Sequence, residues 1–212
     1  MGMISAVVFD IGGVLEKVDD PAGFENRWRE RLGLDEPDFA ARLATVNPGA
    51  EIGNGRLDEA TIRSRYAAAL GLDDHQTDAF MRDMWDWYCG ELDTELAAFL
   101  RGLRPAYRTG ILSNSADGAR REEQARYGFP DLVEVLVYSH EIGVTKPDPE
   151  AYLITCRRLD VHPQEVVFLD DSPRCVEGAR AVGMHGVVHL DTPTSIAAVT
   201  ALLEGGAGAT AR

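Results

Sequence analysis

Three short runs of apolar residues each end at a polar or acidic cluster, and this pattern constrains the fold more than any other feature of the sequence. The runs and the clusters that follow them are residues 4–9 before Asp10, residues 109–112 before Ser113 and Asn114, and residues 166–169 before Asp170 and Asp171. Continuous apolar runs of this length, rich in β-branched residues, are typical of strands buried on both faces of a parallel sheet. Ligands bind beyond the carboxyl ends of the strands in such sheets. The pattern therefore predicts that the three clusters lie together in one site.

Two weaker strand patterns complete a set of five, at residues 133–138 and 186–190. Helical patterns alternate with the strands, at residues 119–127, 150–159 and 173–182. This alternation over residues 94–204 predicts an α/β fold with a doubly wound, parallel five-stranded sheet.

The first strand does not lead directly to the second, because residues 17–93 intervene with four amphipathic helical segments and no strand pattern. Gly49, Gly53 and Gly55 divide these segments into two pairs. We therefore expect an α/β core of residues 1–16 and 94–204, a helical cap of residues 17–93, and a disordered tail of residues 205–212.

Charge and composition exclude several classes of protein. The formal net charge is −14 and there is no basic stripe, so a nucleic-acid partner is not expected. No apolar run approaches the roughly 18 residues of a membrane span, and the first run lacks the flanks of a signal peptide. These features predict a cytoplasmic protein without a membrane partner. The three cysteines, Cys89, Cys156 and Cys175, form no Cys-x-x-Cys pair and are expected to be free and buried.

Asp10 is the first candidate for chemistry, because it stands between a strand and the glycine turn of Asp-Ile-Gly-Gly-Val-Leu. A carboxylate in this place can attack an electrophile and form a covalent acyl-type intermediate. The structural alternative is an aspartate that only forms the turn before two glycines.

Asp170 and Asp171 are the second candidate. Two adjacent carboxylates after a buried strand repel each other unless a cation shares them. Mg²⁺ is typically held by one or two carboxylates together with water and substrate phosphate. The alternative is an N-terminal cap for the helix that starts near Pro173.

Lysine is rare in this chain, because 19 of the 21 basic residues are arginines and the exceptions are Lys17 and Lys146. A lysine at position 146 could neutralise both a phosphoryl group and the crowded carboxylates. Ser113 and Asn114 could donate hydrogen bonds to phosphate oxygens, although a turn or cap role fits Ser113 equally well.

These residues resemble, in order, the four motifs of the haloacid dehalogenase superfamily: Asp10, Ser113, Lys146 with Pro147, and the pair Asp170 and Asp171. The resemblance covers nearly the whole chain, because the helical insertion falls where that family places its cap. It implies a Mg²⁺-dependent phosphatase that acts on a small phosphorylated metabolite through an aspartyl-phosphate intermediate.

The resemblance also implies roles for the individual residues. Asp10 would be the nucleophile, and Ser113 and Lys146 would bind the phosphoryl group, with Asn114 beside them. The metal site would contain Asp10, the backbone carbonyl of Gly12 and Asp171 as ligands, with Asp170 holding metal-bound water.

The sequence departs from the family at Gly12, where most of its phosphatases have a second aspartate that acts as general acid and base. The loss of such a proton donor typically costs about 10²–10⁴ in rate. A branch of the family similarly has an Asp-x-Gly-Gly or Asp-x-Gly-Asn start. Glu16, a cap residue or the substrate could replace the acid, or the substrate could have a good leaving group. Glycine often marks positive φ, where an introduced aspartate would be strained.

Two other interpretations stay open. A 2-haloacid dehalogenase would use the same aspartate to displace halide without a metal, although that branch has Tyr at the position of Gly12 and lacks the acidic pair. A catalytically weak binding or regulatory protein would follow from the missing acid.

The sequence defines neither the substrate nor the oligomeric state. The cap sets the substrate in this family, but four aromatic residues of the insertion are expected to form its core instead: Trp28, Trp85, Trp87 and Tyr88. The five histidines show no ligand spacing and are expected at surface or capping positions.

Overall fold

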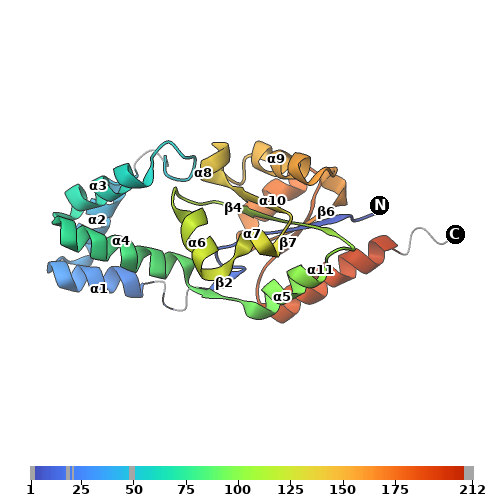
Figure 1. Ribbon diagram of the computed structural model, residues 1–212, viewed down its shortest axis with the longest axis horizontal. Coiled ribbons are helices and arrows are strands. Elements are labelled where there is room, and N and C mark those ends of the chain that lie inside the picture. Colours follow the sequence, from blue (N-terminus) through green and yellow to red (C-terminus); the bar gives the residue numbers. More distant parts are fainter. Residues whose placement is uncertain (1–2, 18–19, 21, 48–50, 208–212) are drawn as a thin grey trace.

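The computed structural model describes residues 3–17, 20, 22–47 and 51–207, with a sheet in one half of the molecule and a group of helices at the other end (Figure 1). The sheet is parallel throughout and has the order β5-β4-β1-β6-β7. Its strands are β1 (Ala6–Phe9), β4 (Arg108–Ser113), β5 (Val135–Tyr138), β6 (Val166–Asp170) and β7 (His185–Val188). The predicted α/β fold with a doubly wound five-stranded sheet is confirmed.

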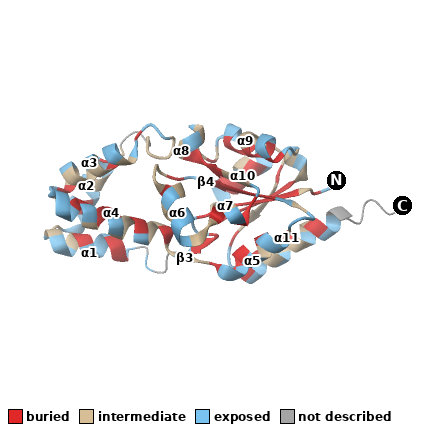
Figure 2. Cartoon of the chain, in the orientation of Figure 1, coloured by how far each residue is buried: buried red, intermediate tan, exposed pale blue. Residues whose placement is uncertain are grey.

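Helices cover both faces of the sheet. Val7 and Phe9 of β1 belong to the hydrophobic cluster that includes residues of α5 (Thr94–Gly102) and α11 (Thr192–Ala207). The alternate residues, Ala6 and Val8, pack in the cluster that contains residues of α9 (Pro149–Leu159) and α10 (Pro173–Ala181). The centre of the sheet is therefore buried on both sides (Figure 2), which explains the continuous apolar run of β1.

Shorter elements connect the strands: α6 (Ala119–Tyr127), α7 (Phe129–Leu132), α8 (Ser139–Ile142) and a 3₁₀ turn at Pro163–Glu165.

The register of the sheet aligns the strand ends. Phe9 lies opposite Ile111 of β4 and Leu169 of β6. The backbone N–H of Asp10 donates to the Leu169 carbonyl at 2.9 Å, so Asp10 lies beside the end of β6. Ser113 is the last residue of β4. The three polar clusters therefore lie at the carboxyl ends of three neighbouring strands, β4, β1 and β6.

Four helices lie between β1 and α5, and we call them the insert: α1 (Gly23–Leu32), α2 (Glu36–Ala44), α3 (Glu59–Leu70) and α4 (Asp74–Cys89). They pack around a hydrophobic cluster of their own, with Phe24, Trp28, Phe39, Leu70, Phe80 and Met81 buried in it. Asp35, Asp58 and Asp73 cap the N-termini of the last three helices by accepting backbone N–H bonds.

A two-stranded antiparallel ribbon connects the insert to the sheet, and the sequence analysis did not predict it. Its strands are β2 (Glu16–Lys17) and β3 (Glu91–Leu92). Lys17 forms an ion pair with the nearly buried Asp93, which also accepts a hydrogen bond from the Thr192 hydroxyl. One of the two lysines is therefore a structural residue that ties the ribbon to the start of α11.

Polar contacts hold the insert against the sheet domain. Arg121 of α6 forms an ion pair with Glu59 of α3 at 2.7 Å, and the backbone N–H of Glu59 donates to Asp117 at 2.8 Å. Arg126 pairs with Asp86 of α4 at 2.7 Å. Helices α6 and α4 thus face each other across the junction, in the middle of Figure 1.

The predicted disordered tail begins too early in the chain. Helix α11 continues to Ala207, so residues 205–207 are helical although glycine has a low helix propensity. Residues 208–212, and Gly49 in the insert, lie outside the described residues.

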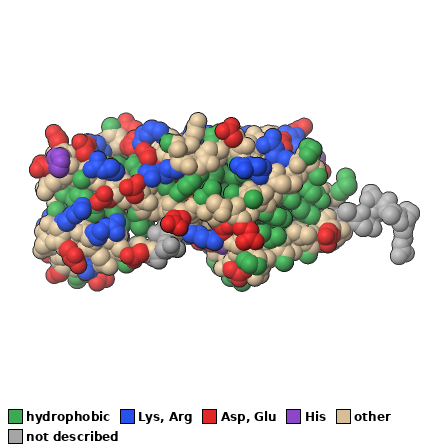
Figure 3. Space-filling view, turned by 60° about the horizontal axis from the view of Figure 1, so that its bottom comes forward, with side chains coloured by type: hydrophobic (Ala, Val, Ile, Leu, Met, Phe, Trp, Pro, Cys, Tyr) green, Lys and Arg blue, Asp and Glu red, His purple; other side chains and the backbone are tan. Residues whose placement is uncertain are grey.

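The surface and the cysteines agree with the composition. Basic and acidic side chains are interspersed on the face that Figure 3 shows. In the described part of the chain, no helix is long and apolar enough to cross a membrane. Cys89, Cys156 and Cys175 are free and buried, as predicted.

Candidate active site

Lys146 links two of the predicted acidic residues. Its ammonium lies 2.8 Å from Asp10 Oδ1 and 2.6 Å from Asp170 Oδ2, and its side chain is 1% exposed. Burial works against the charged form, but the Asp10 and Asp170 carboxylates outweigh it and raise the pKa of Lys146 above its ordinary value. Lys146 therefore stays a cation between the two strand ends.

The side chain of Asn114 fixes the loop that carries Lys146. The Lys146 N–H donates to Asn114 Oδ1 at 2.8 Å, and Asn114 Nδ2 donates to the Lys146 carbonyl at 3.0 Å. The residue after β4 thus clamps the backbone of a residue between α8 and α9. The buried Ser113, at the end of β4, directly precedes this clamp.

Asp10, Asp170 and Asp171 form the acidic cluster that the sequence predicted. One ligand atom from each lies within 4.8 Å of the others. Asp170 is buried and accepts the Ser172 N–H at 2.8 Å, whereas Asp171 is exposed. Burial, together with the charge of Asp170, raises the pKa of Asp10 to about 7 in spite of Lys146. Burial and the charge of Asp170 also raise the pKa of Asp171. Carboxylates crowded in this way suit a divalent cation with oxygen ligands.

The glycine turn after Asp10 places Gly12 and Gly13 in different surroundings. Gly13 has φ of 73°, and a Cβ there would lie 2.3 Å from Asp171 Oδ2, so only glycine fits. Gly12 is exposed, does not have positive φ, and has open space where a Cβ would stand. The positive φ that was expected at position 12 therefore occurs at Gly13 instead. An aspartate side chain at position 12 would have room.

Two further carboxyl groups are buried near Asp10. Glu16 has both carboxyl oxygens buried without a hydrogen-bond partner among the described residues. Glu123 of α6 is also buried and accepts a hydrogen bond from the Tyr138 hydroxyl. Burial and the charge of Glu123 raise the pKa of Glu16 to about 10. Burial, with a smaller contribution from Asp10, raises the pKa of Glu123 to about 8. Sequence reasoning missed Glu123 because the alternating charges of its helix are typical of a solvated face.

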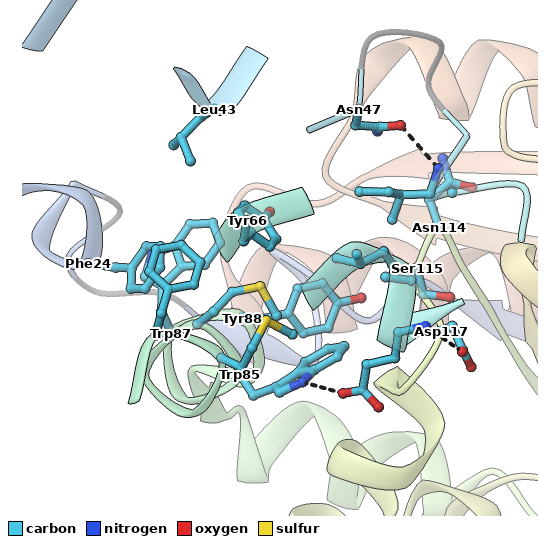
Figure 4. A pocket seen from close by; sticks show the side chains of 18 of the residues that line it. Phe24, Leu43, Asn47, Tyr66, Trp85, Trp87, Tyr88, Asn114, Ser115 and Asp117 are labelled. Carbon is cyan, nitrogen blue, oxygen red and sulfur yellow. Dashed lines mark hydrogen bonds between the residues drawn. The ribbon is translucent and has the colours of Figure 1, made fainter. Parts of the chain in front are cut away.

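A cavity of about 520 Å³, which we call the insert cavity, extends from the insert to the strand ends (Figure 4). Its insert end is lined by apolar and aromatic side chains that include Phe24, Leu43, Tyr66, Phe80 and Trp87. Its other end is formed by residues 114–117, which follow Ser113, and by Thr145, which precedes Lys146. The cavity therefore reaches the two loops that carry the candidate phosphate-binding residues.

The aromatic residues of the insert divide into two groups. Trp28 is packed in the cluster of the insert and donates to Asp83 at 3.1 Å, as expected of a core residue. Trp87 also packs against this cluster, as expected, although it is half-buried and lines the cavity as well. The expectation is wrong for Tyr88, which lines the cavity and packs against the sheet-side cluster, because α4 turns it toward the sheet. Trp85 is both buried and part of the cavity lining.

Two histidines also differ from the expected surface positions. His140 Nδ1 lies 2.8 Å from Ser115 Oγ, and the buried His189 has Nδ1 at 2.8 Å from Ser195 Oγ. Each of these histidine rings has a serine hydroxyl as a partner. The serine lies 25 positions from His140 and 6 positions from His189 in the sequence.

The sequence matches the model of the haloacid dehalogenase-like hydrolases over residues 4–183, so the chain belongs to this family. Phosphatase MT3486 of Mycobacterium tuberculosis (strain CDC 1551 / Oshkosh) is 31% identical over 186 residues, with 85% of each chain covered. (S)-2-haloacid dehalogenase 1 of Pseudomonas sp. (strain CBS-3) is 33% identical over 182 residues, which cover 84% of this chain and 73% of that protein.

The fold is similar to that of a HAD family enzyme from Bacteroides thetaiotaomicron, solved in complex with magnesium and inorganic phosphate. The TM-score is 0.71 at 21% identity, with 88% of this chain and 94% of the other covered. At this identity the likeness shows a common fold.

Proposed function

We propose that this hydrolase is a Mg²⁺-dependent phosphatase that acts on a small phosphorylated substrate through an aspartyl-phosphate on Asp10. The observation that carries the proposal is the contact of Lys146 with both Asp10 and Asp170, beside the exposed carboxylate of Asp171. The 31% identity to a phosphatase over most of the chain supports the same reaction class.

In the first proposed step, a carboxylate oxygen of Asp10 forms a bond to phosphorus while the bond from phosphorus to the leaving oxygen breaks. The electron pair of that bond goes to the leaving group, which then takes up a proton. In the second step, a water oxygen bonds to phosphorus while the bond from phosphorus to the Asp10 oxygen breaks, and the electron pair of that bond restores the Asp10 carboxylate. The attacking water gives up one proton to solvent, and inorganic phosphate is released. In both steps negative charge develops next to the Lys146 ammonium, and the ammonium stabilises this charge.

The other residues of the strand ends bind and position. Ser113 lies on the strand next to β1 and is proposed to donate its hydroxyl to a phosphate oxygen. Asn114 already bonds to both backbone groups of Lys146, so we assign it the positioning of that lysine instead of the predicted direct contact with phosphate.

The donor set fits Mg²⁺, because it consists of oxygen atoms from three crowded carboxylates, and burial together with the charge of Asp170 raises the pKa of both Asp10 and Asp171. Asp10, Asp171 and the carbonyl of the exposed Gly12 would hold the ion, and Asp170 would hold its water. When bound, Mg²⁺ neutralises the phosphoryl oxygens. The insert, within the predicted residues 17–93, would act as a cap over the core of residues 1–16 and 94–204. A cytoplasmic location stays a prediction.

A direct test is to trap the intermediate. Wild-type protein is mixed with a ³²P-labelled acyl phosphate and Mg²⁺, quenched in acid, and digested to locate the labelled peptide. We expect hydroxylamine-labile label on the peptide that contains Asp10 and none in Asp10→Asn. Label on another residue, or turnover of phosphate esters that is indifferent to EDTA, would refute the mechanism.

A second candidate, 2-haloacid dehalogenase activity, is favoured by the 33% identity to such an enzyme. Halide release from 2-chloropropionate in the presence of EDTA distinguishes it from phosphatase activity. A catalytically weak binding protein would bind phosphate but release neither phosphate from esters nor halide from haloacids. Calorimetry with inorganic phosphate and Mg²⁺ would detect this binding.

A further inference from the structure

The insert cavity contains no cation that could pair with a second anionic group of a substrate. Among its described lining residues there is no lysine, arginine or histidine, whereas Glu25, Glu59 and Asp117 are acidic. Glu59 is paired with Arg121, but a carboxylate or second phosphate placed in the cavity would lose its water without a cationic partner on the lining and would meet the charge of Glu25 and Asp117. The cavity therefore disfavours substrates that are anionic beyond the transferred phosphate.

Three polar side chains at the sheet end of the cavity, those of Asn114, Ser115 and Asp117, are already engaged. Asn114 bonds to the backbone of Lys146, and Ser115 Oγ lies 2.8 Å from His140 Nδ1. Asp117 accepts the Glu59 N–H, and Glu59 also accepts from Trp85 Nε1 at 3.0 Å. Few of these groups are left for the hydroxyls of a polyol or sugar, and each buried hydroxyl without a partner weakens binding.

The insert end of the cavity is an aromatic wall. Phe24 stacks on Trp87 with centroids 5.6 Å apart and meets the edge of Phe80 at 5.2 Å. Tyr66 contacts the same Phe80 ring at 4.9 Å. Figure 4 shows Phe24, Trp87 and Tyr66 on the side of the cavity away from Asn114, Ser115 and Asp117. Phe80 is fully buried behind these rings, so the half-buried Tyr66 and Trp87 are the members of the wall that can contact a flat apolar group, held in place by the core.

Gly12 supplies an independent reason for an aromatic leaving group. No carboxyl side chain at position 12 can protonate the departing oxygen. A phenolate needs this proton far less than an alkoxide, because its conjugate acid has a pKa near 10.

We propose, on the basis of the proposed phosphatase function, that the substrate is an aryl phosphate monoester whose ring system is apolar and has no second anionic group. The phosphate lies against Asp10 and Lys146, and the ring extends past residues 114–117 and Thr145 into the insert cavity, whose lining there includes Trp85 and Tyr88.

The test is a set of kcat/KM values at saturating Mg²⁺ with acetyl phosphate, 2-naphthyl phosphate, 6-carboxy-2-naphthyl phosphate, 2-naphthylmethyl phosphate and glycerol 1-phosphate. The last two both have alkyl leaving groups, so their ratio reports on the cavity and not on the acidity of the leaving group. We expect the naphthylmethyl ester to exceed the glycerol ester at least about tenfold, and the carboxylate to lower the rate of the naphthyl ester at least about tenfold.

Acetyl phosphate distinguishes the proposed phosphatase function from the proposed substrate class, because it is too small to reach the aromatic wall. No turnover of any ester, acetyl phosphate included, would refute the phosphatase function itself. Turnover of acetyl phosphate with equal or better use of the glycerol or carboxylated ester would overturn only the aryl phosphate inference.

A charge placed in the cavity should reverse the discrimination. Leu43→Lys puts an ammonium on the lining, and we expect it to raise the ratio of carboxylated to plain naphthyl ester about tenfold. Leu34→Lys is the matched control, because Leu34 packs against the same cluster of the insert but does not line the cavity, and its ratio should stay at the wild-type value. Equal shifts in both variants would overturn the inference. Should Leu43→Lys fail to fold, Met84→Lys on α4 makes the same test from another helix.

Discussion

Two clusters of buried carboxyl groups lie near the turn after β1, and they differ in whether a cation accompanies them. Asp10 and Asp170 share the ammonium of Lys146. Glu16 and Glu123 have no ion pair in the part of the chain that the structure describes, and Glu123 is held by the Tyr138 hydroxyl.

This difference teaches how the fold separates a reactive carboxyl group from inert ones. Burial raises the pKa of Glu16 to about 10 and that of Glu123 to about 8, so both are neutral at pH 7. Burial also raises the pKa of Asp10, but Lys146 opposes the rise, and a bound divalent cation would oppose it further. The first cluster thus has a lysine in direct contact with its carboxylates, whereas the second has no ion pair among the described residues.

The largest expected effect comes from removing the charged carboxylate itself. Asp10→Asn should reduce turnover to below about 1% of the wild-type rate, because an amide of nearly the same shape is a far poorer nucleophile. Steady-state kinetics with acetyl phosphate measures this, and circular dichroism checks the fold. Retention of more than a few per cent of the activity in a folded variant would remove Asp10 from the role of nucleophile.

Lys146→Met turns the first cluster into one like the second, because it leaves Asp10 and Asp170 buried without their cation. We expect a loss of about 3–4 kcal/mol in transition-state stabilisation, measured from kcat/KM. The rate should also rise over a higher pH range than in wild type, since the Asp10 carboxyl is then harder to ionise.

Lys17→Met is the matched control, because Lys17 also pairs with a nearly buried aspartate, at the ribbon and away from the strand ends. It should lower the melting temperature while leaving kcat within a few-fold of wild type. If the two lysine variants lost activity equally, the role of Lys146 in stabilising the transition state would be disproved.

Gly12→Asp adds a carboxyl group to the turn between the two clusters. The open space at Gly12 lets the side chain fit, and as a proton donor it should accelerate alkyl phosphates by up to about 10²-fold and flatten the dependence of rate on leaving-group pKa. The measurement is kcat/KM for esters that span several pKa units. Gly13→Ala is the contrasting variant, and it should lose activity because its Cβ would meet Asp171.

A steep wild-type slope that Gly12→Asp leaves unchanged would mean that position 12 does not face the leaving group. A flat wild-type slope would mean that another group already donates the proton or that chemistry is not rate-limiting. Single-turnover kinetics distinguishes those two cases.

The smallest expected effect concerns stability in the second cluster. The Glu123 carboxyl ionises near its ordinary pKa in the unfolded chain and near 8 in the folded protein, so its contribution is full below about pH 4.5 and is lost as the pH rises toward 8. The free energy of unfolding should fall through this window by at most about 1.4 kcal/mol per pH unit from this group. Glu123→Gln should make the dependence shallower in urea unfolding between pH 5 and 8, whereas the exposed Glu177→Gln should not. An unchanged slope in Glu123→Gln would show that this carboxyl is not held neutral.

Much of the fold could be predicted from the sequence, because local patterns specify it. The apolar runs before Asp10, Ser113 and Asp170 gave the three central strands, since a strand buried on both faces has no polar alternation. The rarity of lysine singled out Lys146, which the structure brings into contact with Asp10 and Asp170.

The ribbon of β2 and β3 escaped prediction because strands of two residues have no periodicity to detect. The end of α11 was missed because Gly205 and Gly206 suggest a break, whereas the helix continues to Ala207.

The sequence by itself determined which chemical groups this protein has at its strand ends, because each lies directly after an apolar run. Only the tertiary structure decided how those groups differ. Glu16 and Glu123, 107 positions apart, become neutral together because folding removes both from water, and Asn114 becomes a clamp because the Lys146 loop returns to it. The different surroundings of Trp87 and Tyr88 depended on which side of α4 meets the sheet, because Tyr88 packs against the sheet-side cluster and Trp87 against that of the insert. Desolvation and long-range contact have no signature in local sequence, so charge state and cavity chemistry emerge only when the chain is folded.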